Sequence, residues 1–174
     1  MERYFAFGAN LSPSTLRRRR VRTRGARPAR LPGHELVFAV RGVPLLEPAF
    51  ATVRPADDEV WGVLYDLDEA ELARLRSYEG LSYREVGVEV ETERGPEAAR
   101  TFVAKRPCPP RPPSARYLGL LVAGARHHGL PDAWLARLEA QPSRHVPVLH
   151  ELVGAGFALV DHVHRAFTRP SERR

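Results

Sequence analysis

Lysine and cysteine are almost missing from this chain of 174 residues. Cys108 is the one cysteine, which excludes an internal disulfide framework and a four-cysteine zinc site. No apolar run approaches the roughly 18 residues that a membrane span needs. The N-terminus enters strand-like sequence at once, without the long apolar segment of a secretory signal. A cytoplasmic protein without a membrane partner is therefore expected.

The near absence of lysine makes the positive charge an arginine excess. Lys105 is the one lysine, so 26 of the 27 basic residues are arginine, and the formal net charge is +6. A basic balance raises the question of nucleic-acid binding. The run Arg17–Arg20 would spread around a helix rather than form one face, and no aromatic residues interleave with it as a base-stacking platform. We therefore expect a solvated surface there and no specific nucleic-acid partner.

Strand patterns fill the first two thirds of the chain and helical patterns fill the rest. Buried or alternating runs predict strands at 3–7, 35–40, 50–53 and 60–67, and a hairpin of 84–93 with 99–104. Helices are predicted from Pro13, from Glu69 to Tyr78, over 115–128 and over 132–140, with capping residues Ser12, Asp68, Ser114 and Asp132. A proline-rich linker at 108–113 joins the two parts, and 146–167 predicts a last helical region. This order favours the α+β class.

Glu79 breaks two rules of helix design at once. At 100° per residue it lies about 20° from Leu72 and about 40° from Leu75, and therefore on the apolar face. It also lies at the helix C-terminus, where a carboxylate opposes the helix dipole. Burial penalises the charged form of such an acid, which suits it to act as a general base near neutral pH. The alternative is a frayed last turn that leaves Glu79 in solvent.

The loop from Phe7 to Leu11 is a second candidate site. Gly8 lets the backbone approach a ligand, and the helix start that follows exposes N–H groups that can hold a carboxylate or an oxyanion. The loop lacks the ending of a phosphate-binding P-loop, and an ordinary tight turn is the alternative. The other candidates are weaker: Cys108 has no neighbouring base, the seven histidines show no zinc spacing, and Tyr117 has the pattern of a buried aromatic residue.

Taken together, these motifs resemble the γ-glutamylcyclotransferase family. The run Tyr4-Phe5-Ala6-Phe7-Gly8-Ala9-Asn10-Leu11 is similar to the family signature Tyr-Phe-Ala-Tyr-Gly-Ser-Asn-Leu. Ser77-Tyr78-Glu79-Gly80 matches its catalytic Glu-Gly turn, and segments at 51–65 and 113–131 are similar to its central strands and C-terminal helix. The resemblance covers about residues 3–140.

The resemblance implies a small mixed β-barrel with flanking helices over 1–144, and it leaves 145–174 as a helical extension of the same domain. It implies release of 5-oxoproline from a γ-glutamyl amino acid or peptide, with no metal or cofactor and with Glu79 as the general base and acid. The implied substrate-binding residues are Tyr4, Phe5, Ala6, Phe7, Gly8, Ala9, Asn10 and Tyr117. A homodimer stays an open alternative to a monomer.

Two departures from the signature leave a second interpretation open. Phe7 replaces a tyrosine and Ala9 replaces a serine, so two hydroxyl groups are missing. If the loop acts through its backbone N–H groups, activity survives; if those hydroxyls bind substrate, affinity or specificity has changed. The alternative to an enzyme is a non-catalytic member of the same fold that binds a small molecule.

Overall fold

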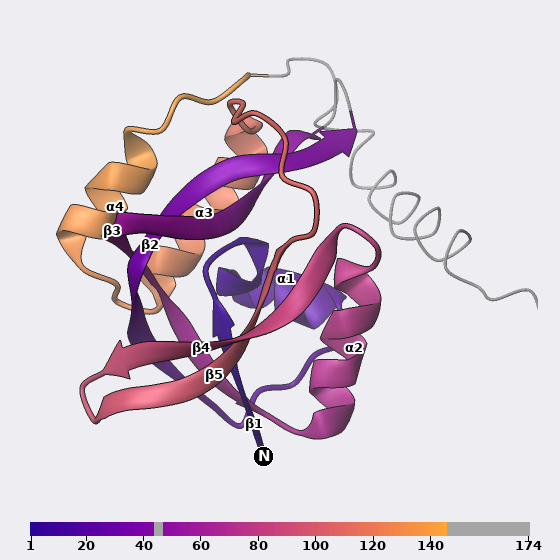
Figure 1. Ribbon diagram of the computed structural model, residues 1–174, viewed down its shortest axis with the longest axis vertical. Helices are drawn as coiled ribbons and strands as arrows, with labels where there is room; N and C mark the ends of the chain where they lie inside the picture. Colours follow the sequence, from indigo (N-terminus) through magenta and orange to yellow (C-terminus); the bar gives the residue numbers. More distant parts are fainter. Residues whose placement is uncertain (44–46, 146–174) are drawn as a thin grey trace, which may run out of the picture.

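The computed structural model describes residues 1–43 and 47–145. Within them, five strands form a closed barrel in the order β1-β3-β2-β4-β5, with helices around it (Figure 1). The strands are β1 (Glu2–Ala6), β2 (Gly25–Val43), β3 (Glu47–Leu67), β4 (Tyr83–Thr92) and β5 (Gly95–Ala104). The helical elements are η1 (Ala9–Leu11), α1 (Pro13–Arg18), α2 (Glu69–Glu79), α3 (Ala115–His127) and α4 (Asp132–Glu139). The mixed barrel with flanking helices confirms the expected fold class.

The barrel closes through β1, which pairs antiparallel with β3 and parallel with β5. Tyr4, Phe5 and Ala6 are all buried, because this strand has the barrel on one side and helices on the other. The predicted hairpin is confirmed: β4 and β5 pair in unbroken register from Tyr83–Ala104 to Thr92–Gly95. Because β1 is buried up to its end, the glycine loop that follows it begins in the middle of the fold.

The strands β2 and β3 are far longer than the sequence pattern predicts. Short strands were expected at 35–40, 50–53 and 60–67, whereas β2 and β3 form one long antiparallel ribbon. No strand was predicted for 25–34 or 54–59, which contain prolines. Pro32 and Pro55 lie beside a register shift of the ribbon at Pro32/His34, which contains Gly33 at φ +67°, whereas Pro28 pairs with Val63 without a shift. A second register shift lies at Phe38/Val40.

The predicted helices are confirmed, with differences at their caps. Gly80 ends α2 at φ +54°, and the Ser114 side chain accepts a hydrogen bond from the Tyr117 N–H at the start of α3. Asp68 is the N-cap residue of α2 as predicted, but its carboxylate makes no capping hydrogen bond and binds the Arg24 guanidinium at 2.7 Å instead. The N-cap residue of α4 is Pro131, and the predicted cap Asp132 is instead the first residue of the helix. The predicted helical region 146–167 lies outside the described residues.

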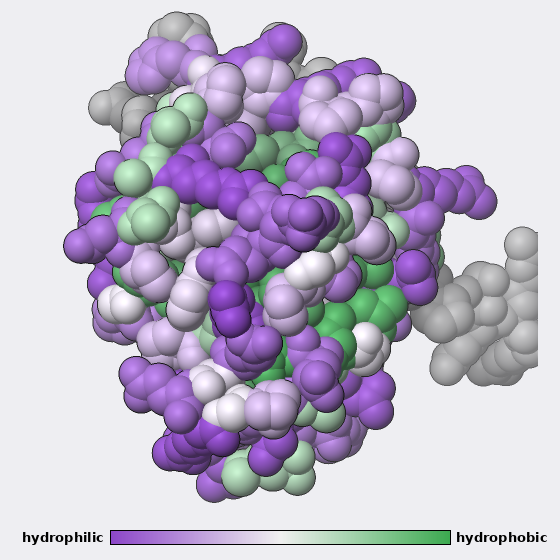
Figure 2. All heavy atoms as spheres, turned by 60° about the vertical axis from the view of Figure 1, so that its left-hand side comes forward, coloured by the Kyte–Doolittle hydropathy of each residue, from purple (hydrophilic) through white to green (hydrophobic). Residues whose placement is uncertain are grey.

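The surface is mostly hydrophilic, as expected for a chain with one hydrophobic core. Figure 2 shows a face on which hydrophilic residues dominate and hydrophobic residues appear mainly in recesses between them. The fully buried side chains come from the barrel and from the inner faces of α2, α3 and α4, among them Phe5, Leu64, Leu72, Leu121 and Leu138. No helix of the described residues is long and apolar enough to cross a membrane.

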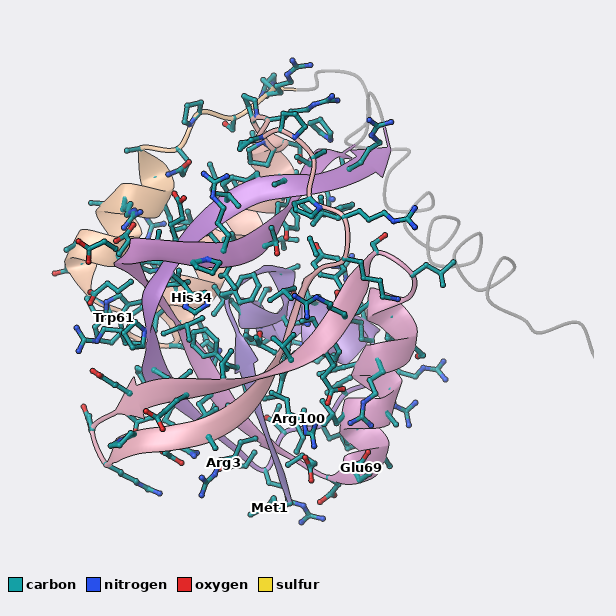
Figure 3. The ribbon with its side chains drawn as sticks, in the orientation of Figure 1. Met1, Arg3, His34, Trp61, Glu69 and Arg100 are labelled. Carbon is teal, nitrogen blue, oxygen red and sulfur yellow. The ribbon has the colours of Figure 1, made fainter. Side chains whose placement is uncertain are left out.

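Ion pairs tie the barrel together at the end where the chain begins. Arg27 binds Asp66 and Glu97, each at 2.7 Å, and Arg3 reaches Glu97 at 3.3 Å. Arg3 and Arg100 lie beside Met1 at this end (Figure 3). The hydrogen bond from Arg27 lowers the pKa of Glu97 from 4.5 to about 2.

This shift predicts an acid-dependent loss of stability. Because the pKa is lower in the folded state, the stabilisation is complete above pH 4.5 and is lost as the pH falls towards 2. We expect Glu97→Gln to lower the free energy of unfolding by about 1 kcal/mol at pH 7, since solvent screens much of the pair's energy. The difference from the unsubstituted protein should vanish near pH 2. Urea titrations at several pH values measure it, and a difference independent of pH would contradict this origin.

Candidate active site

A cavity of about 320 Å³ opens where β1, α1, the end of α2 and the start of α3 meet the β2–β3 ribbon. One part of its wall is polar and includes Tyr4, Asn10, Arg19, Glu79, Tyr83 and Tyr117. Another part is apolar and includes Phe7, Val40, Phe50, Phe102 and Leu120. Arg18, Arg41 and Arg116 also line it. This mixture of an apolar wall with a few polar groups is typical of a small-molecule site.

Glu79 is held at the cavity wall by the end of its helix. It is the last residue of α2, and its side chain is 13% exposed. Gly80 turns the chain directly after it, and the buried residues Leu72 and Leu75 anchor the same face of α2 on the core. The alternative of a frayed turn in solvent is therefore wrong, and Glu79 lies on the inner face of the helix as its spacing predicts.

A hydrogen-bonded network surrounds the Glu79 carboxylate. Arg19 Nη1 donates to Glu79 Oε1 at 2.7 Å and to Asn10 Oδ1 at 3.0 Å. Asn10 Nδ2 donates to the same Glu79 oxygen at 3.2 Å and to Tyr4 Oη at 2.7 Å. The side-chain amide of Asn10 thus links the strand β1, the helix α1 and the catalytic candidate in α2. Removing any one of these groups would leave the others with unsatisfied partners.

Three tyrosines keep neutral hydroxyl groups at the cavity. Burial raises the pKa of Tyr4, Tyr83 and Tyr117, so each phenol stays protonated near neutral pH. Tyr117 Oη accepts a hydrogen bond from the Ala51 N–H at 3.2 Å, and Tyr83 Oη donates to the Ala51 carbonyl at 2.9 Å. The main chain of β3 therefore fixes the positions of Tyr83 and Tyr117.

The glycine loop lines the cavity, and neighbouring groups leave little space around it. A Cβ atom at Gly8 would lie 3.3 Å from Tyr117 Oη, closer than most side-chain contacts. The Leu11 N–H donates to the Gly8 carbonyl at 2.9 Å, which closes the turn into η1. On the far side, Tyr65 Oη lies 3.3 Å from the Asn10 carbonyl and 2.9 Å from His128 Nε2. The loop thus has a fixed shape without the two hydroxyls that Phe7 and Ala9 lack.

The structure brings most of the predicted site residues to one cavity. Glu79, Tyr117, Tyr4 and the loop residues 7–10 all line it. Phe5 and Ala6 do not: both are fully buried, and the Phe5 carbonyl accepts a hydrogen bond from Thr101 Oγ1 at 2.8 Å. In the described ranges, no cluster of three or more His, Cys, Asp or Glu side chains is placed to hold a metal ion.

Sequence reasoning missed Arg19 and Tyr83. The run Arg17–Arg20 was expected to form a solvated surface, and Arg19 is the exception: its side chain is 21% exposed and binds Glu79. Arg19 lies one turn after Thr15, and the burial of Thr15 in the structure shows that this face points inward. Four consecutive arginines carry no sequence signal that singles out Arg19. Tyr83 directly precedes the strand predicted at 84–93, and its side chain was given no role in the site.

Comparisons with known proteins point to one family. The model of the AIG2-like family matches residues 59–138. The γ-glutamyl cyclotransferase gliK of Aspergillus fumigatus is 32% identical over 181 residues, with 87% of this chain and 66% of the relative covered. The γ-glutamylcyclotransferase of Mus musculus is 28% identical over 144 residues, with 79% of this chain and 77% of the relative covered. The chain spans about two thirds of the length of its fungal relatives.

Solved structures agree on the fold. A structure titled as a γ-glutamyl cyclotransferase superposes with a TM-score of 0.75 at 24% identity, covering 91% of this chain and 98% of that one. A human protein titled as uncharacterized superposes with a TM-score of 0.73 at 27% identity, covering 82% of this chain and 89% of that one. The barrel and its flanking helices are thus shared across these proteins.

Proposed function

Since the chain belongs to the AIG2-like, γ-glutamyl cyclotransferase family, we propose that it is an enzyme that converts a γ-glutamyl amino acid or peptide to 5-oxoproline and a free amino acid. The observation that carries the proposal is the Glu79 carboxylate, held at the wall of the cavity beside Asn10 and the glycine loop. The loop sequence Gly8-Ala9-Asn10-Leu11 is nearer to the γ-glutamyl amino acid type of the family than to its glutathione-specific type.

The proposed reaction is an intramolecular acyl transfer. Glu79 accepts a proton from the neutral α-amine of the substrate as the amine nitrogen attacks the γ-carbonyl carbon of the same molecule. The bond between that carbon and the departing nitrogen then breaks, and Glu79 returns the proton to the departing amine. Attacking amine and carbonyl belong to one molecule, so bringing them together costs the enzyme little. Its task is proton transfer, which contributes about 10²–10⁴-fold.

The remaining cavity groups have supporting roles in this proposal. Main-chain N–H groups of the glycine loop, together with the Tyr117 hydroxyl, stabilise the oxyanion that forms on the γ-carbonyl oxygen, where each donor is worth about 10²–10³-fold. The tyrosines stay protonated, so they can donate hydrogen bonds at neutral pH. The apolar wall formed by Phe7, Phe50 and Leu120 receives the departing amino acid. Every step uses side chains and main-chain groups of this chain.

A substrate panel tests the proposal. Purified protein is incubated with γ-glutamyl dipeptides, glutathione and γ-glutamyl amines, and 5-oxoproline is measured in each reaction. We expect release from γ-glutamyl dipeptides. If no compound of the panel gives 5-oxoproline, the enzyme proposal is wrong. The non-catalytic alternative, which the missing hydroxyls of Phe7 and Ala9 favour, would then predict ligand binding that Glu79→Gln leaves unchanged.

A further inference from the structure

Arg19 brings a guanidinium group to the carboxylate that the proposed reaction uses. Its Nη1 atom lies 2.7 Å from Glu79 Oε1, and its central carbon lies 5.2 Å from the centre of the Tyr78 ring. With Asn10 as a third contact, the side chain is fixed at the cavity wall. Arg19 is therefore in place to touch any ligand that reaches Glu79.

Elsewhere in this protein, one arginine repeatedly binds two carboxylates. Arg27 lies between Asp66 and Glu97, Arg76 lies between Glu69 and Glu85, and Arg100 lies between Glu2 and Glu85. The planar guanidinium suits this role, because its five N–H donors form a rigid fork. Arg19 likewise binds the carboxylate of Glu79, and it lies at the wall of a cavity of about 320 Å³ where a ligand can approach its guanidinium.

The electrostatics of the cavity favour such a ligand. The described residues that line it include the four arginines Arg18, Arg19, Arg41 and Arg116 and the one carboxylate Glu79, and a second carboxylate, Glu47, pairs with Arg116 at 3.4 Å. Arg18 and Arg116 lie close enough that the charge of Arg18 adds to burial in lowering the pKa of Arg116. A cleft lined by an excess of one charge attracts ligands of the opposite sign. A γ-glutamyl amino acid carries two carboxylates and one ammonium group, and so meets this requirement.

The α-amine and the α-carboxylate of the γ-glutamyl group are bonded to the same carbon atom. A substrate whose amine reaches Glu79 therefore brings its α-carboxylate next to the group that binds Glu79. We propose that Arg19 binds the α-carboxylate of the γ-glutamyl group and thereby aims the α-amine at Glu79. This inference rests on the proposed function and assigns to it the residue that selects a γ-glutamyl group over other amine-bearing acyl groups.

A pair of substrates that differ only in the α-carboxylate tests the inference. γ-Glutamyl-alanine carries it, and 4-aminobutanoyl-alanine lacks it but presents the same amine, amide and leaving group; both release alanine. We expect Arg19→Gln to lower kcat/KM for γ-glutamyl-alanine by about 30- to 100-fold, the loss typical of a charge-assisted contact. The same variant removes a partner of Glu79 for both substrates, so kcat/KM for 4-aminobutanoyl-alanine should fall as well, but at least about tenfold less than for γ-glutamyl-alanine. Equal losses on both substrates would mean that Arg19 acts only through the shape of the site.

Binding gives the same comparison without turnover. 5-Oxoproline keeps the carboxylate and 2-pyrrolidinone lacks it, so calorimetric titration of both ligands isolates the contact. Arg19→Gln should weaken binding of 5-oxoproline by about 30-fold more than binding of 2-pyrrolidinone. An equal change for both ligands overturns the inference, even where the panel of γ-glutamyl compounds establishes the activity. If that panel shows no turnover, the proposed function is wrong. The binding comparison then tests by itself whether Arg19 binds the carboxylate.

Two variants control for effects on the fold. Arg17→Gln removes the same charge two positions before Arg19, but Arg17 is exposed and does not line the cavity, so neither substrate should be affected. Arg19→Lys keeps the charge without the planar fork, and we expect it to recover part of the discrimination between the two substrates. Failure of Arg19→Lys to exceed Arg19→Gln in this discrimination would contradict a carboxylate contact.

Discussion

Replacing Glu79 by glutamine is expected to lower 5-oxoproline release by at least about 10³-fold, within the range of general acid-base catalysis. The amide is nearly isosteric with the carboxylate, and its oxygen can still accept the hydrogen bonds of Arg19 and Asn10. It cannot take up a proton from the substrate amine near neutral pH. The variant should therefore fold normally, bind substrate and fail to turn it over. Progress curves with γ-glutamyl-alanine measure the effect.

Glu69→Gln is the matched control for this substitution. Glu69 lies in the same helix α2 but at its opposite end (Figure 3). Its side chain is 63% exposed and pairs with Arg76. This variant loses the same charge far from the cavity and should keep the full rate. If Glu79→Gln and Glu69→Gln turn over substrate at similar rates, Glu79 is not the proton carrier.

The substitution Gly124→Ala is expected to cost about 1–3 kcal/mol of unfolding free energy, as overpacking of a core does. A Cβ atom at Gly124 would lie 2.6 Å from the carbonyl carbon of Leu11 and 2.6 Å from its Cβ. The helix α3 thus rests directly on the backbone that follows Asn10. The added methyl group must push this segment away, and we expect the rate of 5-oxoproline release to fall together with stability. Urea unfolding and turnover assays measure the two effects.

Gly119→Ala separates this contact from the general effect of a helical alanine. Gly119 lies in the same helix and is exposed, and a methyl group added there would extend into open space. Alanine is the better helix former by up to about 1 kcal/mol, so this variant should be neutral or more stable. Equal stability of the two variants would contradict the packing of α3 on the glycine loop.

The position of Glu79 could be predicted from the sequence, because it depends on the spacing of residues along one helix. Leu72, Leu75 and Glu79 fall on one face, and Gly80 marks the end of the helix, so the acid is placed by short-range rules. The partners of Glu79 could not be found in this way. They lie 69 and 60 positions away, at Asn10 and Arg19, and only the tertiary fold places η1 and the end of α1 beside the end of α2.

Other errors of prediction have a similar origin. Four arginines in a row look alike in sequence, and the burial of the helix face that carries Arg19 is a tertiary property. No strand was predicted around Pro28, Pro32 and Pro55, yet the long ribbon of β2 and β3 includes all three, with Pro32 and Pro55 beside a register shift. Asp68 is the N-cap residue of α2, but its carboxylate pairs with Arg24, 44 positions away, instead of making a capping hydrogen bond. Local patterns thus predicted the elements, and tertiary contacts decided their ends and partners.

The origin of the carbonyl oxygen in the product tests the account most directly. The reaction is run with γ-glutamyl-alanine in oxygen-18 water, and the products are identified by mass spectrometry. Attack by the substrate's own amine gives 5-oxoproline without label, in an amount equal to the alanine released and absent with Glu79→Gln. Formation of glutamate with one oxygen-18 atom in its γ-carboxylate would show that water attacks the carbonyl, and the proposed cyclisation would be wrong.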